Sequence, residues 1–176
     1  MTISATEPDW NREQHTPGRY EPAKNLLATI RAYQRIKSKG GIMARLTSPF
    51  LVLQHRFWSA VTGADIPLNS KIAGGLLMPH PNGIVVHPEA EIGPNCLLFQ
   101  QVTIGTGGRI PGTPMIAGHV DIGAGARILG GVTIGAHARI GANAVVIDDV
   151  PENATAVGIP AKVQGHREKR QYEQPE

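Results

Sequence analysis

The chain has 176 residues, a formal net charge of +3 and one cysteine, Cys96, so its composition excludes an internal disulfide and a highly charged disordered chain. It holds 21 Gly and 14 Pro but only 3 Phe, 3 Tyr and 2 Trp. Small and β-branched residues must therefore fill a narrow core, which favours a repetitive β architecture. No signal peptide or long apolar segment is visible, and the sequence predicts a cytoplasmic protein.

Residues 1–63 are predicted to form an N-terminal tail and a short helical segment. Residues 1–20 read as a polar, poorly ordered tail. Apolar residues at helical spacing predict helices over about 22–39 and about 43–61, separated by a glycine pair. The segment carries nine Lys/Arg against four Asp/Glu, a net charge of +5. No nucleic-acid motif accompanies this charge, and a solvated helix face is the favoured interpretation over contact with an anionic membrane.

From residue 66 the sequence follows a period of six. Apolar residues recur at 66, 72, 78 and 84, resume after a two-residue slip at 92, 98 and 104, and continue at 110, 116, 122, 128, 134, 140 and 146. Such a hexapeptide repeat predicts a parallel β-helix, in which three hexads close one triangular coil and the apolar residues stack inside. The predicted β-helix spans 64–165, and 166–176 form a polar C-terminal tail.

Several stretches of this region resemble the left-handed β-helix acyltransferases, and within them the serine acetyltransferase group. They are "DIPLNSKIAGGLLMPHPNGIVV", "VTIGTGG", "IGAGARILGGVTIGAHARIGANAVVIDDVP" and "ATAVGIPAKVQG". The resemblance implies the left-handed coil, acetyl-CoA as acyl donor, no metal, and a homotrimer with active sites between subunits.

His80 and Asp65 are the candidate catalytic residues. Acyl transfer from a thioester to an alcohol needs a base for the hydroxyl proton, and a histidine supported by a carboxylate suits that role. Asp65 precedes His80 by 15 residues, which places the two at nearby corners of an 18-residue coil. The resemblance puts the catalytic histidine on His80 and the carboxylate that orients it on Asp65. The alternative is that Asp65 caps a strand and His80 is a surface turn residue.

The resemblance also implies a coenzyme A site. Its residues are Gly105, Thr106 and Gly107, the small residues Ala124 and Ala142, and the basic residue Lys162. For the two alanines, simple corner packing is the alternative. The stretch "GTGGRIPGTP" reads as a loop that interrupts the coils.

Two departures from the serine acetyltransferase pattern suggest a different acceptor. Pro79 stands where that group has an aspartate, and Gly112 and Thr113 stand where it has an Arg-His pair that helps to hold the amino acid. A site without these charges lacks an obvious means of holding a zwitterion. The sequence therefore predicts an O-acetyltransferase acting on a sugar or polysaccharide hydroxyl, with serine as the alternative acceptor.

Two further readings belong to other classes of protein. A zinc lyase of the carbonic anhydrase type, which shares three histidines between subunits of a trimer on the same coil, is a remote alternative with His80, His87 and His119 as ligands; the pair of histidines five residues apart that is typical of that class is missing here. A non-catalytic trimeric scaffold is the other reading. His87 lies where the six-residue period shifts by two residues. We interpret it as a turn residue, and the alternative is that it lines the acceptor pocket. His119 and His137 are expected to face outward.

Overall fold

A computed structural model describes residues 3–164. The helices are η1 (Trp10–Glu13), α1 (Pro22–Lys39) and α2 (Gly41–Thr62). The strands are β1 (Lys71–Ile72), β2 (Val85–Val86), β3 (Glu91–Ile92), β4 (Leu97–Leu98), β5 (Thr103–Gly105), β6 (Met115–Ile116), β7 (Asp121–Ile122), β8 (Arg127–Leu129), β9 (Thr133–Ile134), β10 (Arg139–Ile140), β11 (Val145–Val146), β12 (Thr155–Val157) and β13 (Lys162–Gln164). The C-terminal tail predicted over 166–176 lies outside the described residues.

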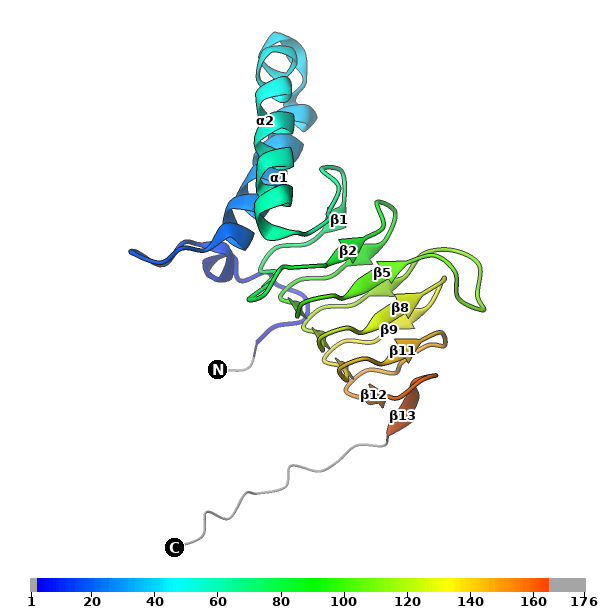
Figure 1. Ribbon diagram of the computed structural model, residues 1–176. Helices are drawn as coiled ribbons and strands as arrows, with labels where there is room; N and C mark the ends of the chain where they lie inside the picture. The colour runs from blue at the N-terminus through cyan, green and yellow to red at the C-terminus, as the bar shows by residue number, and fades with distance from the viewer. Residues whose placement is uncertain (1–2, 165–176) are drawn as a thin grey trace, which may run out of the picture.

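The strands form three sheets, in the orders β1-β3-β6-β9, β13-β12-β10-β7-β4 and β11-β8-β5-β2. Every pairing is parallel except the one between β12 and the terminal strand β13. Successive turns of the chain therefore contribute one short strand to each sheet, and the stacked coils form a prism (Figure 1). The predicted fold class, a mainly β protein built as a left-handed parallel β-helix with a short N-terminal helical segment, is confirmed.

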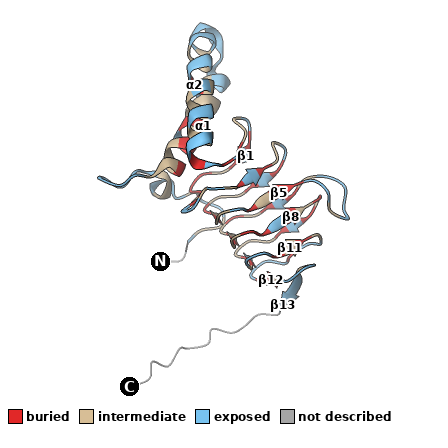
Figure 2. Ribbon diagram, viewed as in Figure 1, coloured by how far each residue is buried: buried red, intermediate tan, exposed pale blue. Residues whose placement is uncertain are grey.

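The core is a ladder of aliphatic side chains inside the coils, as the hexapeptide period predicts. Figure 2 shows buried residues lining the inside of the coils and exposed residues on their outer faces. The ladder continues through Ile104, Ile122, Ile128 and Ile134, each fully buried. Stacking of neighbouring coils is what removes these side chains from water, because a single coil cannot cover its own apolar face.

The ladder departs from the prediction at two places. Ile110 is 39% exposed, because residues 106–113 leave the coil as the loop that the glycine-rich stretch predicts, so Ile110 is not a core position. The two-residue slip lies between Met78 and Val86, not beside His87: Met78 and Val86 are successive ladder residues, both buried. Ile84 is buried too, as the residue two before Val86.

Helices α1 and α2 pack against each other as a hairpin that stands on the first coil (Figure 1). The predicted helix over 22–39 coincides with α1, and the one over 43–61 falls inside α2. Leu26, Leu27 and Ile30 of α1 are buried and join the core of the prism. No helix in residues 3–164 has the length and apolarity needed to cross a membrane.

The segment before α1 is an ordered strap, so the expectation of a poorly ordered tail is wrong for residues 3–20. The side chain of Asn95, itself buried, accepts a hydrogen bond from the Asp9 amide and donates to the Ser4 and Glu7 carbonyls, each at 2.8 Å. The Arg12 guanidinium donates to the carbonyls of Gly75 and Asn95. Polar side chains that satisfy buried backbone groups hold this strap on the prism.

Candidate functional site

The turn that carries His80 is longer than the equivalent turn of the next coil. Eight positions separate Leu77 from Val85, whereas six separate their partners Leu97 and Thr103. The two extra residues of the slip bulge outward, and both Pro79 and His80 are exposed. The chain therefore presents the His80 imidazole to solvent at one edge of the prism.

Asp65 lies on the same edge as this turn. Its backbone forms a parallel bridge with Val85, and the Gly83 amide donates to the Gly63 carbonyl at 2.8 Å. Within residues 3–164 no hydrogen bond or ion pair joins the side chains of Asp65 and His80. The fold thus brings the two candidates to one edge without placing them in direct contact, and their catalytic roles stay a prediction.

Ala124 and Ala142 lie on this edge too, below the His80 turn. The Asn143 amide donates to the Ala124 carbonyl, and the Gly125 amide to the Gln100 carbonyl, so that Ala142, Ala124 and Gln100 are stacked in successive coils. With coils spaced like neighbouring strands, the column from His80 to Ala142 is roughly 14 Å long, which an extended pantetheine arm can cover. Ala124 and Ala142 are the small side chains of this column, and their part in a coenzyme A site stays a prediction.

Gln100 is a residue that sequence reasoning missed at this edge. Its Oε1 is buried and has no hydrogen-bond partner in the described part of the chain. A buried acceptor without a partner costs free energy unless water or a ligand satisfies it. Gln100 lies one coil below Asn82 and close to His80. The sequence could not predict this position, because it depends on which turn contains the two-residue slip.

The other predicted coenzyme A residues lie at the opposite end of the same sheet. Gly105 ends β5 beside His87, and a Cβ at Gly105 would sit 4.0 Å from the His87 Cβ. Thr106 and Gly107 are exposed at the start of the loop, and Gly107 has a φ of 105°, a backbone conformation that favours glycine. Within one chain these residues and the alanine column do not form a single groove.

Four more residues singled out in the sequence lie away from the His80 edge. Lys162 is exposed on β13, in the last sheet pairing of the prism. Gly112 and Thr113 belong to the loop over 106–113, where the Thr113 hydroxyl donates to the Glu89 carbonyl at 3.2 Å. His87 accepts a hydrogen bond from the Glu89 amide on its Nδ1 at 3.1 Å, which supports its interpretation as a turn residue.

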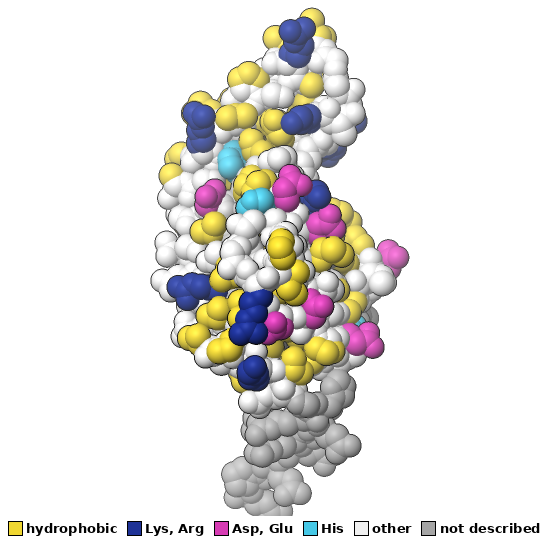
Figure 3. Space-filling model, turned by 90° about the vertical axis from the view of Figure 1, so that its right-hand side faces the viewer, with side chains coloured by type: hydrophobic (Ala, Val, Ile, Leu, Met, Phe, Trp, Pro, Cys, Tyr) yellow, Lys and Arg dark blue, Asp and Glu magenta, His cyan; other side chains and the backbone are white. Residues whose placement is uncertain are grey.

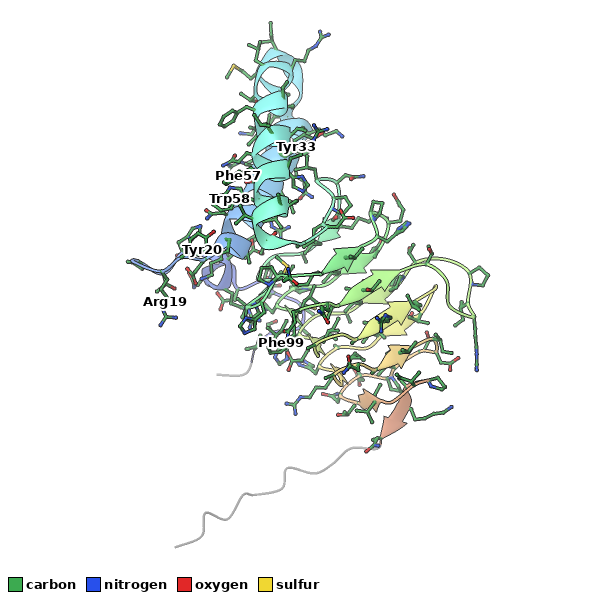
Figure 4. All side chains as sticks on the ribbon, in the orientation of Figure 1. Arg19, Tyr20, Tyr33, Phe57, Trp58 and Phe99 are labelled. Carbon is green, nitrogen blue, oxygen red and sulfur yellow. The ribbon has the colours of Figure 1, made fainter. Side chains whose placement is uncertain are left out.

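A cavity of about 250 Å³ adjoins the His80 turn. Pro79 and Pro81 line one side, and the start of α1 lines the other with Glu21 and Lys24. Tyr20, labelled in Figure 4 at the base of the helical hairpin, stands at the same place. The apolar part of the wall is made of Pro22, Ala23, Leu27, Leu76, Leu77 and Met78.

Glu21 and Lys24 give this cavity one charge of each sign. The Lys24 ammonium lies 2.9 Å from a Glu21 carboxylate oxygen. A hydrogen bond from the Thr16 amide, together with the Lys24 ammonium, holds the pKa of the Glu21 carboxyl below its usual value, so it is ionised at neutral pH. Sequence reasoning missed both residues, because only the fold of the N-terminal segment brings them beside Pro79.

His119 and His137 form a pair on a different edge. Their Nδ1 atoms lie 2.7 Å apart, so one ring donates and the other accepts. They stack with Asn95 above and Asn153 below, and all four residues have positive φ.

His80, His87 and His119 lie at three different corners of one chain. No group of three or more His, Cys, Asp or Glu that could hold a metal ion occurs among residues 3–164.

The His119 pair makes stability sensitive to acid. Burial, together with His137, lowers the pKa of His119 below its usual 6.5. As the pH falls through about 6.5, the unfolded chain takes up this proton before the native state does, and native stability declines. His119→Asn, which suits the positive φ because Asn95 and Asn153 occupy equivalent positions, should weaken this decline. Urea unfolding across the acidic range would show it, and identical pH dependences for both proteins would contradict it.

Comparisons with known proteins agree with the resemblance that the hexapeptide-repeat motifs of the sequence indicate. No model of a known protein family matches the chain. It is 41% identical over 105 residues to a serine acetyltransferase from Synechococcus elongatus, and 44% identical over 123 residues to serine acetyltransferase 5 from Arabidopsis thaliana. These alignments cover 58% and 69% of this chain, but only 43% and 39% of the relatives. The chain thus spans about two-fifths of the length of these two relatives.

Solved structures give the same result for the fold. A serine acetyltransferase in complex with CoA has a TM-score of 0.68 at 32% identity, with 82% of this chain and 58% of that chain covered. A soybean serine acetyltransferase complexed with serine has a TM-score of 0.69 at 34% identity, with 81% and 57% covered.

The predicted sugar or polysaccharide acceptor is wrong. The curated relatives and the solved neighbours alike are serine acetyltransferases, and two of the structures are complexes with serine. The prediction rests on Pro79 and on Gly112 and Thr113, which carry no charge; it leaves out Glu21 and Lys24, which line the same cavity as Pro79. In sequence and in fold, the resemblance of this chain to the serine acetyltransferase group of hexapeptide-repeat acyltransferases is confirmed.

Proposed function

We propose that this protein transfers the acetyl group of acetyl-CoA to the hydroxyl of serine. The support is the agreement between its relatives and the His80 edge, where an exposed histidine, a nearby carboxylate and a charged cavity occur together. The serine hydroxyl oxygen attacks the thioester carbonyl while the His80 imidazole accepts the hydroxyl proton. Collapse of the tetrahedral intermediate breaks the C–S bond, and the protonated imidazole returns the proton to the coenzyme A thiolate. The products are O-acetylserine and free coenzyme A.

Asp65 is the positioning residue of this proposal. A carboxylate beside His80 would favour the tautomer that leaves one ring nitrogen free to accept the proton, and would stabilise the imidazolium that forms. Asp65 and His80 are both exposed and share an edge of the prism. Binding of the two substrates would bring the side chains together, since catalytic hydrogen bonds commonly tighten only in the substrate complex.

The cavity beside Pro79 holds the amino acid in this proposal. Glu21 would accept hydrogen bonds from the ammonium group of serine, and Lys24 would donate to the carboxylate of serine. These contacts would replace the ion pair that Glu21 and Lys24 form with each other in the free protein. The cavity volume of about 250 Å³ suits an acceptor of this size. The ion pair of the free protein thus matches the charges of a free amino acid.

Neutralising this ion pair is expected to weaken serine binding. For Glu21→Gln and Lys24→Gln the KM for serine should rise roughly 10- to 100-fold, the cost of one lost charge-assisted hydrogen bond, while the KM for acetyl-CoA changes little. Lys37→Gln is the matched control, because Lys37 lies on the same helix but contacts the Tyr33 ring instead of the cavity. Equal serine KM values for all three variants and the parent protein would refute this role.

A homotrimer would complete the coenzyme A site. Within one chain the Gly105–Gly107 segment and the Ala124–Ala142 column stand at opposite ends of one sheet. Threefold packing of triangular prisms would place the Gly105–Gly107 segment of one subunit beside the Ala124–Ala142 column of its neighbour. Lys162 would then be available for a phosphate of coenzyme A. Sedimentation at equilibrium should give three times the mass of the chain.

The proposed activity is tested by an acetyl-transfer assay over a panel of acceptors. Free thiol release from acetyl-CoA should depend on L-serine, with much weaker turnover for L-threonine and none for sugars. Turnover that is indifferent to serine would overturn the proposal. A cytoplasmic location is part of the proposal and is supported by the buried free thiol of Cys96, although one relative is named as chloroplastic.

A further inference from the structure

Helix α2 carries an uncovered apolar stripe. Its large side chains on one side, each between 41% and 73% exposed, are Ile42, Met43, Leu46, Phe50, Leu53, Phe57 and Val61. Apart from the adjacent pair Ile42 and Met43, they recur at intervals of three and four residues and therefore share one face along the whole helix. The opposite face packs on α1, with Leu51 and Thr62 buried. Figure 4 shows Phe57 on the outer side of the hairpin, away from the coils.

Positive charge accompanies this stripe. Residues 22–62 contain no Asp or Glu, and their basic residues are Lys24, Arg31, Arg35, Lys37, Lys39, Arg45 and Arg56. Lys24 and Arg31 are paired with Glu21 and Glu13. Among residues 3–164 the other five form no ion pair. Figure 3 shows Lys and Arg with hydrophobic side chains over the helical hairpin, whereas the acidic side chains in this view lie over the coils, together with further Lys and Arg.

Arg45 and Arg56 flank the stripe itself. They are about three helical turns apart, so both lie on the same border between the apolar face and the rest of the helix. Arginines at this position keep the guanidinium at a polar surface while the neighbouring side chains enter an apolar layer. Because α2 is about 33 Å long at 1.5 Å per residue, the whole stripe can lie flat on such a layer.

Charge distinguishes a second copy of the hairpin from a lipid surface as the cover of this stripe. A second copy of the hairpin would bring its own cations against these, with no acidic residue in 22–62 to compensate. An anionic lipid surface supplies both an apolar layer for the stripe and negative charge for its border. We propose that α2 docks the protein on an anionic membrane surface, with the stripe in the interface and Arg45 and Arg56 on the headgroups.

Flotation with vesicles tests this docking. The protein should bind vesicles that contain about one-third phosphatidylglycerol, should bind vesicles of phosphatidylcholine alone at least tenfold more weakly, and should be released by salt. Arg45→Gln/Arg56→Gln is expected to lower the partition coefficient roughly 10- to 30-fold. Leu46→Gln/Phe50→Gln is expected to lower it by at least about tenfold.

Met115→Gln is the matched control, because Met115 is an exposed apolar residue on β6 of the prism, and it should leave vesicle binding unchanged. Circular dichroism and acetyl transfer in solution should be the same for all variants, which separates lost docking from lost folding. Absence of binding to the anionic vesicles would overturn the proposal. So would a Leu46→Gln/Phe50→Gln protein that sediments as a smaller assembly but binds vesicles as the parent does, since a second copy would then cover the stripe.

Discussion

Replacing His80 by alanine should lower kcat for acetyl transfer to serine by roughly 10²- to 10⁴-fold, the usual loss when a general base is removed. Without the imidazole, water is left to accept the hydroxyl proton, while the proposed contacts of serine with Glu21 and Lys24 persist. The KM for serine should therefore change much less than kcat. Steady-state measurement of coenzyme A release at saturating acetyl-CoA gives both constants.

His87→Ala is the control for this experiment, since His87 is a turn residue whose Nδ1 accepts from the Glu89 amide. Its kcat should stay close to that of the parent. His80 is exposed and makes no side-chain hydrogen bond within residues 3–164, so His80→Ala should unfold at the same urea concentration as the parent. A His80→Ala protein with near-normal kcat would remove the catalytic role from this histidine.

Truncation of a ladder isoleucine should have the largest effect on stability. Ile122 is fully buried in β7, with strand neighbours above and below. Ile122→Ala removes apolar volume that the coils cannot fill by collapsing, because the backbone of each coil is fixed by hydrogen bonds to two others. The expected loss is about 2–5 kcal/mol of unfolding free energy.

Ile110→Ala provides the comparison, because Ile110 occupies the same hexapeptide position in the sequence but lies exposed in the loop over 106–113. Its effect should stay within about 0.5 kcal/mol. Urea unfolding of both variants measures the difference. Similar losses for the two isoleucines would mean that the loop packs into the core of the assembled protein.

Much of the fold could be predicted because the hexapeptide period has a local cause. Each coil must place an apolar side chain inward every six residues, so the positions of Ile92, Ile128 and Ile134 follow from counting. Counting fails where residues are inserted, since an insertion leaves the period intact on both sides of it. The sequence predicts the two added residues beside His87, whereas the structure has them in the His80 turn, and Ile110 keeps the period inside a loop.

The candidate site was less predictable, because it depends on contacts between distant segments. His80 and Asp65 could be identified from their spacing and their resemblance to known motifs. Glu21 and Lys24 could not, since they reach the cavity only because α1 packs on the prism through Leu26, Leu27 and Ile30. The error about the acceptor has the same origin. The prediction used the residue types at Pro79, Gly112 and Thr113, whereas the charge at a site is the sum over every segment that lines it.

The N-terminal strap also changes how the protein unfolds. A stack of coils joined only to nearest neighbours can lose its ends one coil at a time. Here the Asn95 side chain holds Ser4, Glu7 and Asp9 of the strap, and Arg12 donates to the Gly75 carbonyl of the coil above. In the coil below, Gly118 lies so close to the strap that a Cβ there would clash with the Ala5 carbonyl. One short segment therefore touches three successive coils. These coils should open together in amide hydrogen exchange, as a single cooperative unit, while the coils beyond β9 open separately.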